Sequence, residues 1–189
     1  RFEDAFGNIN HTFTTSVSDG ELTISATGMV ETTGTSGMIS GGPERLPVGV
    51  YLRETDLTMV TPELVELAFE ARGASDGSNL DFAHTLNGII NERIVFDEDA
   101  THTATPACDA LEAGRGVCQD LAHILIASAR AGGLPARYVS GYQFAEGRAR
   151  DEHAGHAWVE LFIEDLGWVA FDPTAGASSN ERYVRVAIG

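Results

Sequence analysis

Three short segments of the chain carry residue types that could together attack an acyl group. The first contains Cys118, which follows Gly114 and Gly116 and begins a long segment with apolar residues at helical spacing. A thiol at a helix N-terminus lies at the positive end of the helix dipole, which favours the thiolate, the nucleophilic form. Because most free cysteines are small buried hydrophobic residues, Cys118 alone does not establish a catalytic site.

The second segment supplies a candidate base. His156 begins a segment of alternating pattern in which His156, Trp158 and Glu160 share one face of the expected strand. An imidazole at the start of a strand can approach a thiol and act as its general base. His153 is a nearby alternative, but it lies in a charged loop and is expected to be solvated.

The third segment ends in an acid. Asp172 closes an apolar strand, a position where aspartate is commonly only a turn former. The expected strands 156–163 and 167–171 form a hairpin, so His156 and Asp172 should lie near the open ends of adjacent antiparallel strands. There the carboxylate can fix the imidazole tautomer and stabilise the imidazolium. Cys118, His156 and Asp172 therefore form a candidate catalytic triad.

Other polar residues near these segments have structural explanations. His123 lies on the expected helix but off the face of Cys118, so we expect a packed core histidine. Asp120 suits the first turn of a helix because of the helix dipole. We expect Cys108 to be an inert thiol. The cysteines and histidines lack the spacing of zinc ligands, so neither a metal nor another cofactor is predicted.

These segments must be positioned by both helices and strands. Capping residues and apolar spacing predict helices that begin near Thr61 and Ser78 and one over 117–130. Alternating segments that predict strands follow at 136–143, 155–163, 167–171 and 183–188. Helices followed by strands, without regular alternation, indicate an α+β fold.

The N-terminal part of the chain has a different character. Strands are expected at 12–17 and 22–30, separated by a turn at 18–20, and the Gly-, Ser- and Thr-rich segment 34–47 is expected to be a loop. We therefore expect an N-terminal β-module with its linker at residues 1–47 and a catalytic core at residues 48–189.

The composition restricts the partners. The 189 residues carry a net charge of −16, and all 12 basic residues are arginine. Such a charge repels nucleic acids and anionic membranes, so neither is expected as a partner. No apolar run approaches the roughly 20 residues of a membrane span, and no leader is visible. Two cysteines give no sign of an oxidising compartment, so reduced thiols and a cytoplasmic location are expected. The oligomeric state stays open.

Segments 116–142, 156–160 and 167–174 together resemble the core of transglutaminase-like proteins, in the bacterial cysteine protease branch of that superfamily. Residues 4–8 are similar to the β-region that precedes this core in the bacterial branch. The resemblance implies a papain-like core of helices packed on an antiparallel sheet. It covers most of the chain.

The resemblance also implies roles. Cys118 would be the nucleophile, His156 the base and Asp172 the orienting acid of a reaction that passes through a thioester. It implies further that the strand ending near Tyr142 borders the cleft, so Tyr142 is expected to line the substrate site.

The tryptophans bear on the type of reaction. Animal transglutaminases place a tryptophan upstream of the cysteine, where it helps to stabilise the oxyanion, whereas Trp158 and Trp168 both lie downstream of Cys118. We therefore expect a protease or amidase acting on peptides or proteins, with hydrolysis favoured over transamidation. The alternative is a non-catalytic peptide-binding or scaffold domain that retains the fold. A complete triad argues against it, because a binding module needs none of the three residues.

Overall fold

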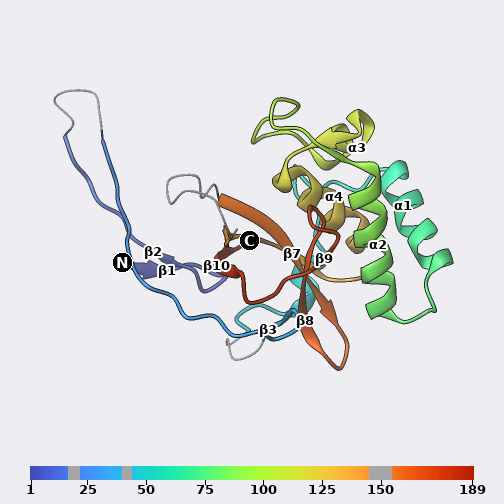
Figure 1. Cartoon of the computed structure of the whole chain (residues 1–189), viewed down its shortest axis with the longest axis horizontal. Helices are drawn as coiled ribbons and strands as arrows, with labels where there is room; N and C mark the ends of the chain where they lie inside the picture. The colour runs from blue at the N-terminus through green and yellow to red at the C-terminus, as the bar shows by residue number, and fades with distance from the viewer. Residues whose placement is uncertain (17–21, 40–43, 145–154) are drawn as a thin grey trace.

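A layer of helices covers one face of the main sheet, as Figure 1 shows for the computed structural model. The structure describes residues 1–16, 22–39, 44–144 and 155–189. The helices are α1 (Pro62–Ala74), α2 (Asn79–Arg93), α3 (Ala107–Ala113) and α4 (Cys118–Ala131), preceded by the 3-10 helix η1 (Val48–Leu52). The α+β fold class expected from the sequence is confirmed.

The main sheet has six strands in the order β10-β6-β7-β8-β3, with β9 paired to β8. Its members are β3 (Met38–Ile39), β6 (Ala136–Gln143), β7 (Gly155–Ile163), β8 (Gly167–Asp172), β9 (Ala177–Ser178) and β10 (Tyr183–Ile188), and neighbouring strands in it run antiparallel. Two small sheets pair β1 (Phe2–Glu3) with β2 (Ile9–Asn10), and β4 (Val95–Phe96) with β5 (Arg115–Gly116).

The predicted helix starts are confirmed. Pro62 is the first residue of α1, where its missing N–H costs no hydrogen bond. Ser78 caps α2, because its Oγ accepts from the N–H of Asp81 at 3.1 Å. α4 ends at Gly132, whose N–H donates to the carbonyl of Ser128 at 2.9 Å. Local capping chemistry thus sets the ends of these helices.

The core lies between α4 and the sheet. Every residue of α4 from Asp120 to Ala129 is buried, and the helix packs against β7. Val159 and Leu161 on β7 and Phe171 on β8 belong to this core. Each large apolar side chain fully buried in this way contributes about 1.5–3 kcal/mol relative to exposure. The predicted two-faced pattern of β7 is confirmed, since Trp158 packs in a separate cluster on the other face.

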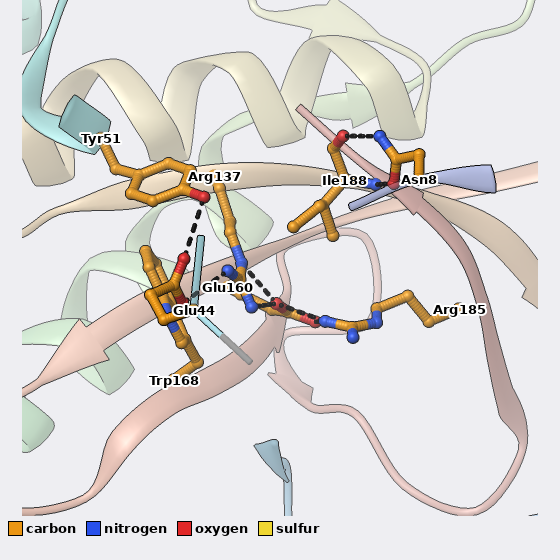
Figure 2. Close-up of polar contacts among 8 residues, drawn as sticks. All are labelled: Asn8, Glu44, Tyr51, Arg137, Glu160, Trp168, Arg185 and Ile188. Atoms are coloured by element: carbon orange, nitrogen blue, oxygen red, sulfur yellow. Dashed lines mark hydrogen bonds and ion pairs between the residues drawn. The ribbon is translucent and has the colours of Figure 1, made fainter. Parts of the chain in front are cut away.

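The second face of the sheet is tied to the N-terminal part of the chain by polar contacts (Figure 2). Glu160 is fully buried and pairs with Arg137, at 2.6 Å, and with Arg185, at 3.1 Å. Glu44 accepts hydrogen bonds from the indole of Trp168, at 2.6 Å, and from Arg137, at 3.2 Å. These contacts hold the segment that precedes η1 against the sheet.

A second tie joins the N-terminal hairpin to the last strand of the sheet. The side chain of Asn8 donates to the carbonyl of Ile188 at 2.7 Å and accepts from the N–H of Ile188 at 2.9 Å (Figure 2). The amide thus imitates a strand residue at the edge of β10. The two residues are 180 positions apart in the sequence.

Part of the N-terminal prediction is wrong. Residues 11–16 and 22–30 form no strand and extend away from the main sheet (Figure 1), although their alternating pattern predicted strands. A strand needs a pairing partner, and these segments leave apolar side chains such as Phe13, Ile24 and Met29 exposed. The expected turn at 18–20 lies outside the described residues. Residues 38–39, expected in a loop, instead form β3.

Within the described ranges, no helix is long and apolar enough to cross a membrane.

Candidate active site

The entry to α4 is built around the side chain of Asp120. Cys118 is the first residue of this helix. Oδ2 of Asp120 accepts from the N–H of Val117 at 2.8 Å and from the hydroxyl of Thr101 at 2.5 Å. A Cβ at Gly116 would lie 2.7 Å from the same oxygen, so only glycine fits. Asp120 therefore has the structural role expected of it, and it fixes the backbone that presents Cys118.

His156 and Asp172 meet on the face of the sheet that also carries Trp158. Nε2 of His156 lies 2.7 Å from Oδ2 of Asp172, which is fully buried. Oδ1 of Asp172 accepts from the N–H of Thr174 at 2.8 Å and from that of Ala175 at 3.3 Å. The structure thus brings these two predicted residues into direct contact and fixes both carboxylate oxygens.

The charges of this pair follow from its surroundings. Burial alone would lower the pKa of His156, but its hydrogen bonds to Asp172 and Cys118 and their negative charge outweigh burial and raise its pKa to about 9. Burial acts to raise the pKa of Asp172, yet the hydrogen bond and positive charge of His156 hold that pKa below its usual value. Both shifts favour an imidazolium–carboxylate pair at neutral pH.

The contact with Asp172 determines which ring nitrogen of His156 can interact with Cys118. Because Nε2 contacts Asp172, the nitrogen left to face the thiol is Nδ1. The ring stacks beside Trp158, with centroids 6.1 Å apart and planes at 30°. This arrangement can accept a proton from a thiol and pass it to a leaving group.

Two residues near the pair were missed by the sequence reasoning. The hydroxyl of Tyr183, on β10, donates to Oδ2 of Asp172 at 2.7 Å. Nε2 of Gln143, on β6, donates to the oxygen of Tyr183 at 2.6 Å. Both strands were predicted, but their pairing was not, and that pairing places the two side chains together. An isolated tyrosine at the start of a strand carries no local signal of such a contact.

The remaining predicted residues lie apart from the pair. His123 is buried on α4, 5.4 Å from the ring of Tyr138, and burial lowers its pKa, as suits the core histidine expected here. Cys108, on α3, is a free cysteine like Cys118, and burial and the contact with Asp109 raise the pKa of its thiol. His153 lies outside the described residues.

Tyr142 lies on the strand next to that of His156. On β6 it pairs with Gly155, next to the pair formed by Gly141 and His156. Its side chain is exposed to 51%, so a bound peptide can contact it. Its role in substrate binding stays a prediction.

Among the described residues, no group of three or more His, Cys, Asp or Glu side chains could hold a metal ion.

Comparison with known proteins gives a consistent picture. Residues 66–173 match the model of the transglutaminase-like superfamily. An uncharacterized protein of Mycobacterium tuberculosis is 28% identical over 98% of this chain and 66% of its own length. A protein-glutamine gamma-glutamyltransferase of Pseudomonas aeruginosa is 37% identical over 31% of this chain and 10% of its own length. This chain thus spans less than two thirds of either relative.

Two solved structures share the fold. A proposed cysteine protease from Cytophaga hutchinsonii has a TM-score of 0.64 at 27% identity, covering 75% of this chain and 46% of its own. The periplasmic domain of TgpA from Pseudomonas aeruginosa, bound to ethylmercury, has a TM-score of 0.54 at 26% identity, covering 69% and 49%. Since that neighbour is periplasmic, the cytoplasmic location expected for this chain stays a prediction.

Proposed function

Because the chain belongs to the transglutaminase-like superfamily, we propose that it is an enzyme that breaks an amide bond of a peptide or protein through Cys118, His156 and Asp172. The observation that carries the proposal is the 2.7 Å contact of His156 with Asp172, on a ring whose other nitrogen serves Cys118. A binding module has no need of this arrangement, whereas a cysteine nucleophile requires it.

In the first step, Sγ of Cys118 bonds to the carbonyl carbon and an electron pair moves to the carbonyl oxygen. The resulting oxyanion needs hydrogen-bond donors. The N–H groups of Cys118 and Gln119 lie in the first turn of α4, where helical geometry leaves them without intrahelical acceptors. Neither has a backbone acceptor among the described residues. We assign the oxyanion to these two donors.

Collapse of this intermediate needs an acid. Nδ1 of His156 gives its proton to the leaving nitrogen, the C–N bond breaks, and a thioester on Cys118 remains. The neutral imidazole then takes a proton from water as the water oxygen attacks the thioester carbon. The C–S bond breaks, the acid leaves, and the thiolate and imidazolium are restored. Asp172 keeps the ring oriented and stabilises its charged form throughout.

Hydrolysis is favoured over transfer to an amine. Trp158 packs beside His156 on the sheet, and Trp168 donates its N–H to Glu44. The two tryptophans thus have other positions and partners than the upstream oxyanion donor of animal transglutaminases. Transamidation is the second candidate, because the chain resembles a protein-glutamine gamma-glutamyltransferase over part of its length.

The test is a peptide library offered to the natural full-length protein in water enriched in oxygen-18, with and without a dansylated primary amine. Hydrolysis yields new carboxylates that contain the heavy oxygen, whereas transfer yields dansylated products. Cys118→Ala is the control and should give neither product. If the wild-type protein also gives neither product from any peptide, the proposal is wrong.

Thiol chemistry separates the enzyme from a scaffold that only retains the fold. Cys108 is an internal reference, because burial and Asp109 raise the pKa of its thiol. We expect iodoacetamide at pH 6 to modify Cys118 at least about 10-fold faster than Cys108, as activated thiols react through the thiolate. Equal rates for the two cysteines would favour the scaffold.

We further propose that residues 48–189 are the catalytic core and that residues 1–47 form a β-module and its linker. The separate two-stranded sheet of β1 and β2 supports this division. β3 lies in the linker but pairs with β8, so the linker also contributes to the edge of the core sheet.

A further inference from the structure

The carboxylate of Asp172 is shared between two donors on one oxygen. Oδ2 lies 2.7 Å from Nε2 of His156 and also 2.7 Å from the hydroxyl oxygen of Tyr183. The carboxylate is fully buried, so water cannot replace either donor without a rearrangement. The strength of the hydrogen bond between His156 and Asp172 therefore depends on how much of the negative charge on Oδ2 is stabilised by the hydrogen bond from Tyr183.

Gln143 fixes the direction of the phenol proton. Its amide nitrogen donates to the oxygen of Tyr183 at 2.6 Å. An amide N–H₂ group can only donate, so the hydroxyl of Tyr183 must donate its own proton to Asp172. Burial, and then the charge of Asp172, raise the pKa of Tyr183 above its usual value. Tyr183 thus stays a neutral donor over the pH range in which His156 titrates.

Tyr183 is held by a strand with its own supports. β10 carries it and is fixed farther along by the ion pair of Arg185 with buried Glu160 and by the paired hydrogen bonds of Asn8 and Ile188 (Figure 2). The ring also packs edge-on against Trp158, with centroids 5.3 Å apart. A side chain supported on this many sides can set the position of another group.

We propose that Tyr183 is a positioning residue of the reaction, whose hydroxyl fixes Oδ2 of Asp172 and withdraws part of its charge from His156. The inference rests on the proposed function of Cys118, His156 and Asp172. It adds that Tyr183, on β10, tunes the pKa of the His156 imidazolium through Asp172. An imidazolium held by a less stabilised carboxylate would give up its proton less readily to the leaving nitrogen.

The test is a pH titration of His156 in which NMR signals of its imidazole ring report the pKa. Every protein compared also carries Cys118→Ala. Tyr183→Phe removes one donor from a buried carboxylate, so Asp172 binds the imidazolium more strongly. We expect the pKa of His156 to rise by about half a unit or more, given the strength of hydrogen bonds to charged groups. Tyr51→Phe is the matched control, because it removes a phenol that donates to a different carboxylate, that of Glu44.

A second pair of variants covers the case in which Tyr183→Phe fails to fold. Gln143→Glu presents an acceptor that competes with Asp172 for the phenol proton, and it should also raise the pKa of His156. Gln143→Leu leaves the phenol proton on Asp172, and it should shift the pKa less than Gln143→Glu does. If Tyr183→Phe and Gln143→Glu titrate like Tyr51→Phe and Gln143→Leu, the inference is wrong.

This titration needs neither substrate nor turnover. It can therefore fail while the proposed function stands, and a protein without amidase activity can still show the shift. In a protein that does turn over, Tyr183→Phe should lower kcat with little change in KM, and move the alkaline limb of the rate profile to higher pH.

Discussion

His156 and Asp172 come from strands β7 and β8, and their side chains meet at 2.7 Å near the start of β7 and the end of β8. The contact joins a ring that is partly accessible to a carboxylate with no exposure, since their side chains are 12% and 0% exposed. The buried partner is therefore fixed while the ring can still face a substrate.

Replacing Cys118 by alanine should abolish acyl chemistry and leave the fold intact. Alanine is the most favourable residue for a helix, and Cys118 is only half-buried, so the free energy of unfolding should change by no more than about 1 kcal/mol. Peptide turnover and thermal unfolding check the two halves of this prediction. Turnover in the folded variant would remove Cys118 from the mechanism.

The raised pKa of His156 makes stability depend on pH. The group ionises at about 9 in the folded protein and near 6.5 when unfolded. A group whose pKa is raised by folding stabilises the folded protein. This contribution of His156 is fully present below pH 6.5 and is lost as the pH rises through 9. The free energy of unfolding of the wild type relative to His156→Gln should therefore fall between pH 6.5 and 9. A difference that stays constant over this range would contradict the charged pair.

Asp172→Asn should be nearly as damaging as Asp172→Ala. The N–H groups of Thr174 and Ala175 require an acceptor at Oδ1, so the new amide nitrogen would replace Oδ2 and face His156. Two donors cannot bond each other, and the ring would be driven to the wrong tautomer. We expect both variants to lose about 10²-fold or more in kcat/KM. A nearly active Asn variant would show that the orienting group is another residue.

Gly116→Ala should disturb the nucleophile through the backbone. The added Cβ would lie 2.7 Å from Oδ2 of Asp120, the carboxylate that fixes the entry to α4. We expect a loss of about 1–3 kcal/mol in stability and slower alkylation of Cys118. Gly88→Ala is the control, since its Cβ meets nothing within 4 Å inside α2 and should stabilise by about 0.5–1 kcal/mol. Equal effects of Gly116→Ala and Gly88→Ala on stability would mean that the turn before α4 can accommodate a Cβ atom at residue 116.

Tyr142→Ala should raise KM more than it lowers kcat, because Tyr142 is exposed on the strand that pairs with the strand of His156 and is assigned no part in the chemical steps. Steady-state kinetics on the best peptide of the library checks this. Unchanged KM would exclude Tyr142 from the substrate site.

Much of the site was predictable because its signals are local. The alternating pattern around His156 and the short connection to β8 determine a hairpin, and a hairpin places His156 near Asp172. The glycines before Cys118 and the apolar pattern after it likewise determine the entry and the buried face of α4. In each case the information lies within a few residues of the group it positions.

The features that the sequence did not predict correctly depend on contacts between distant segments. Tyr183 reaches Asp172 only because β10 pairs with β6, and no residue near Tyr183 encodes that choice. Residues 22–30 have the alternation of a strand, yet pattern alone cannot supply a partner, and the described structure gives them none. Short elements such as α3 and η1 are too brief for a helical period to show.

The bond between Asn8 and Ile188 also has a consequence for the order of events during translation. A ribosome releases the chain from its N-terminus at about 5–20 residues per second, so Asn8 emerges long before the strand that it holds. Cys118, His156 and Asp172 likewise emerge before Tyr183. The nascent chain therefore carries its nucleophile, base and acid before β10 can dock on β6, and the hydrogen bond of Tyr183 to Asp172 cannot form until β10 has emerged.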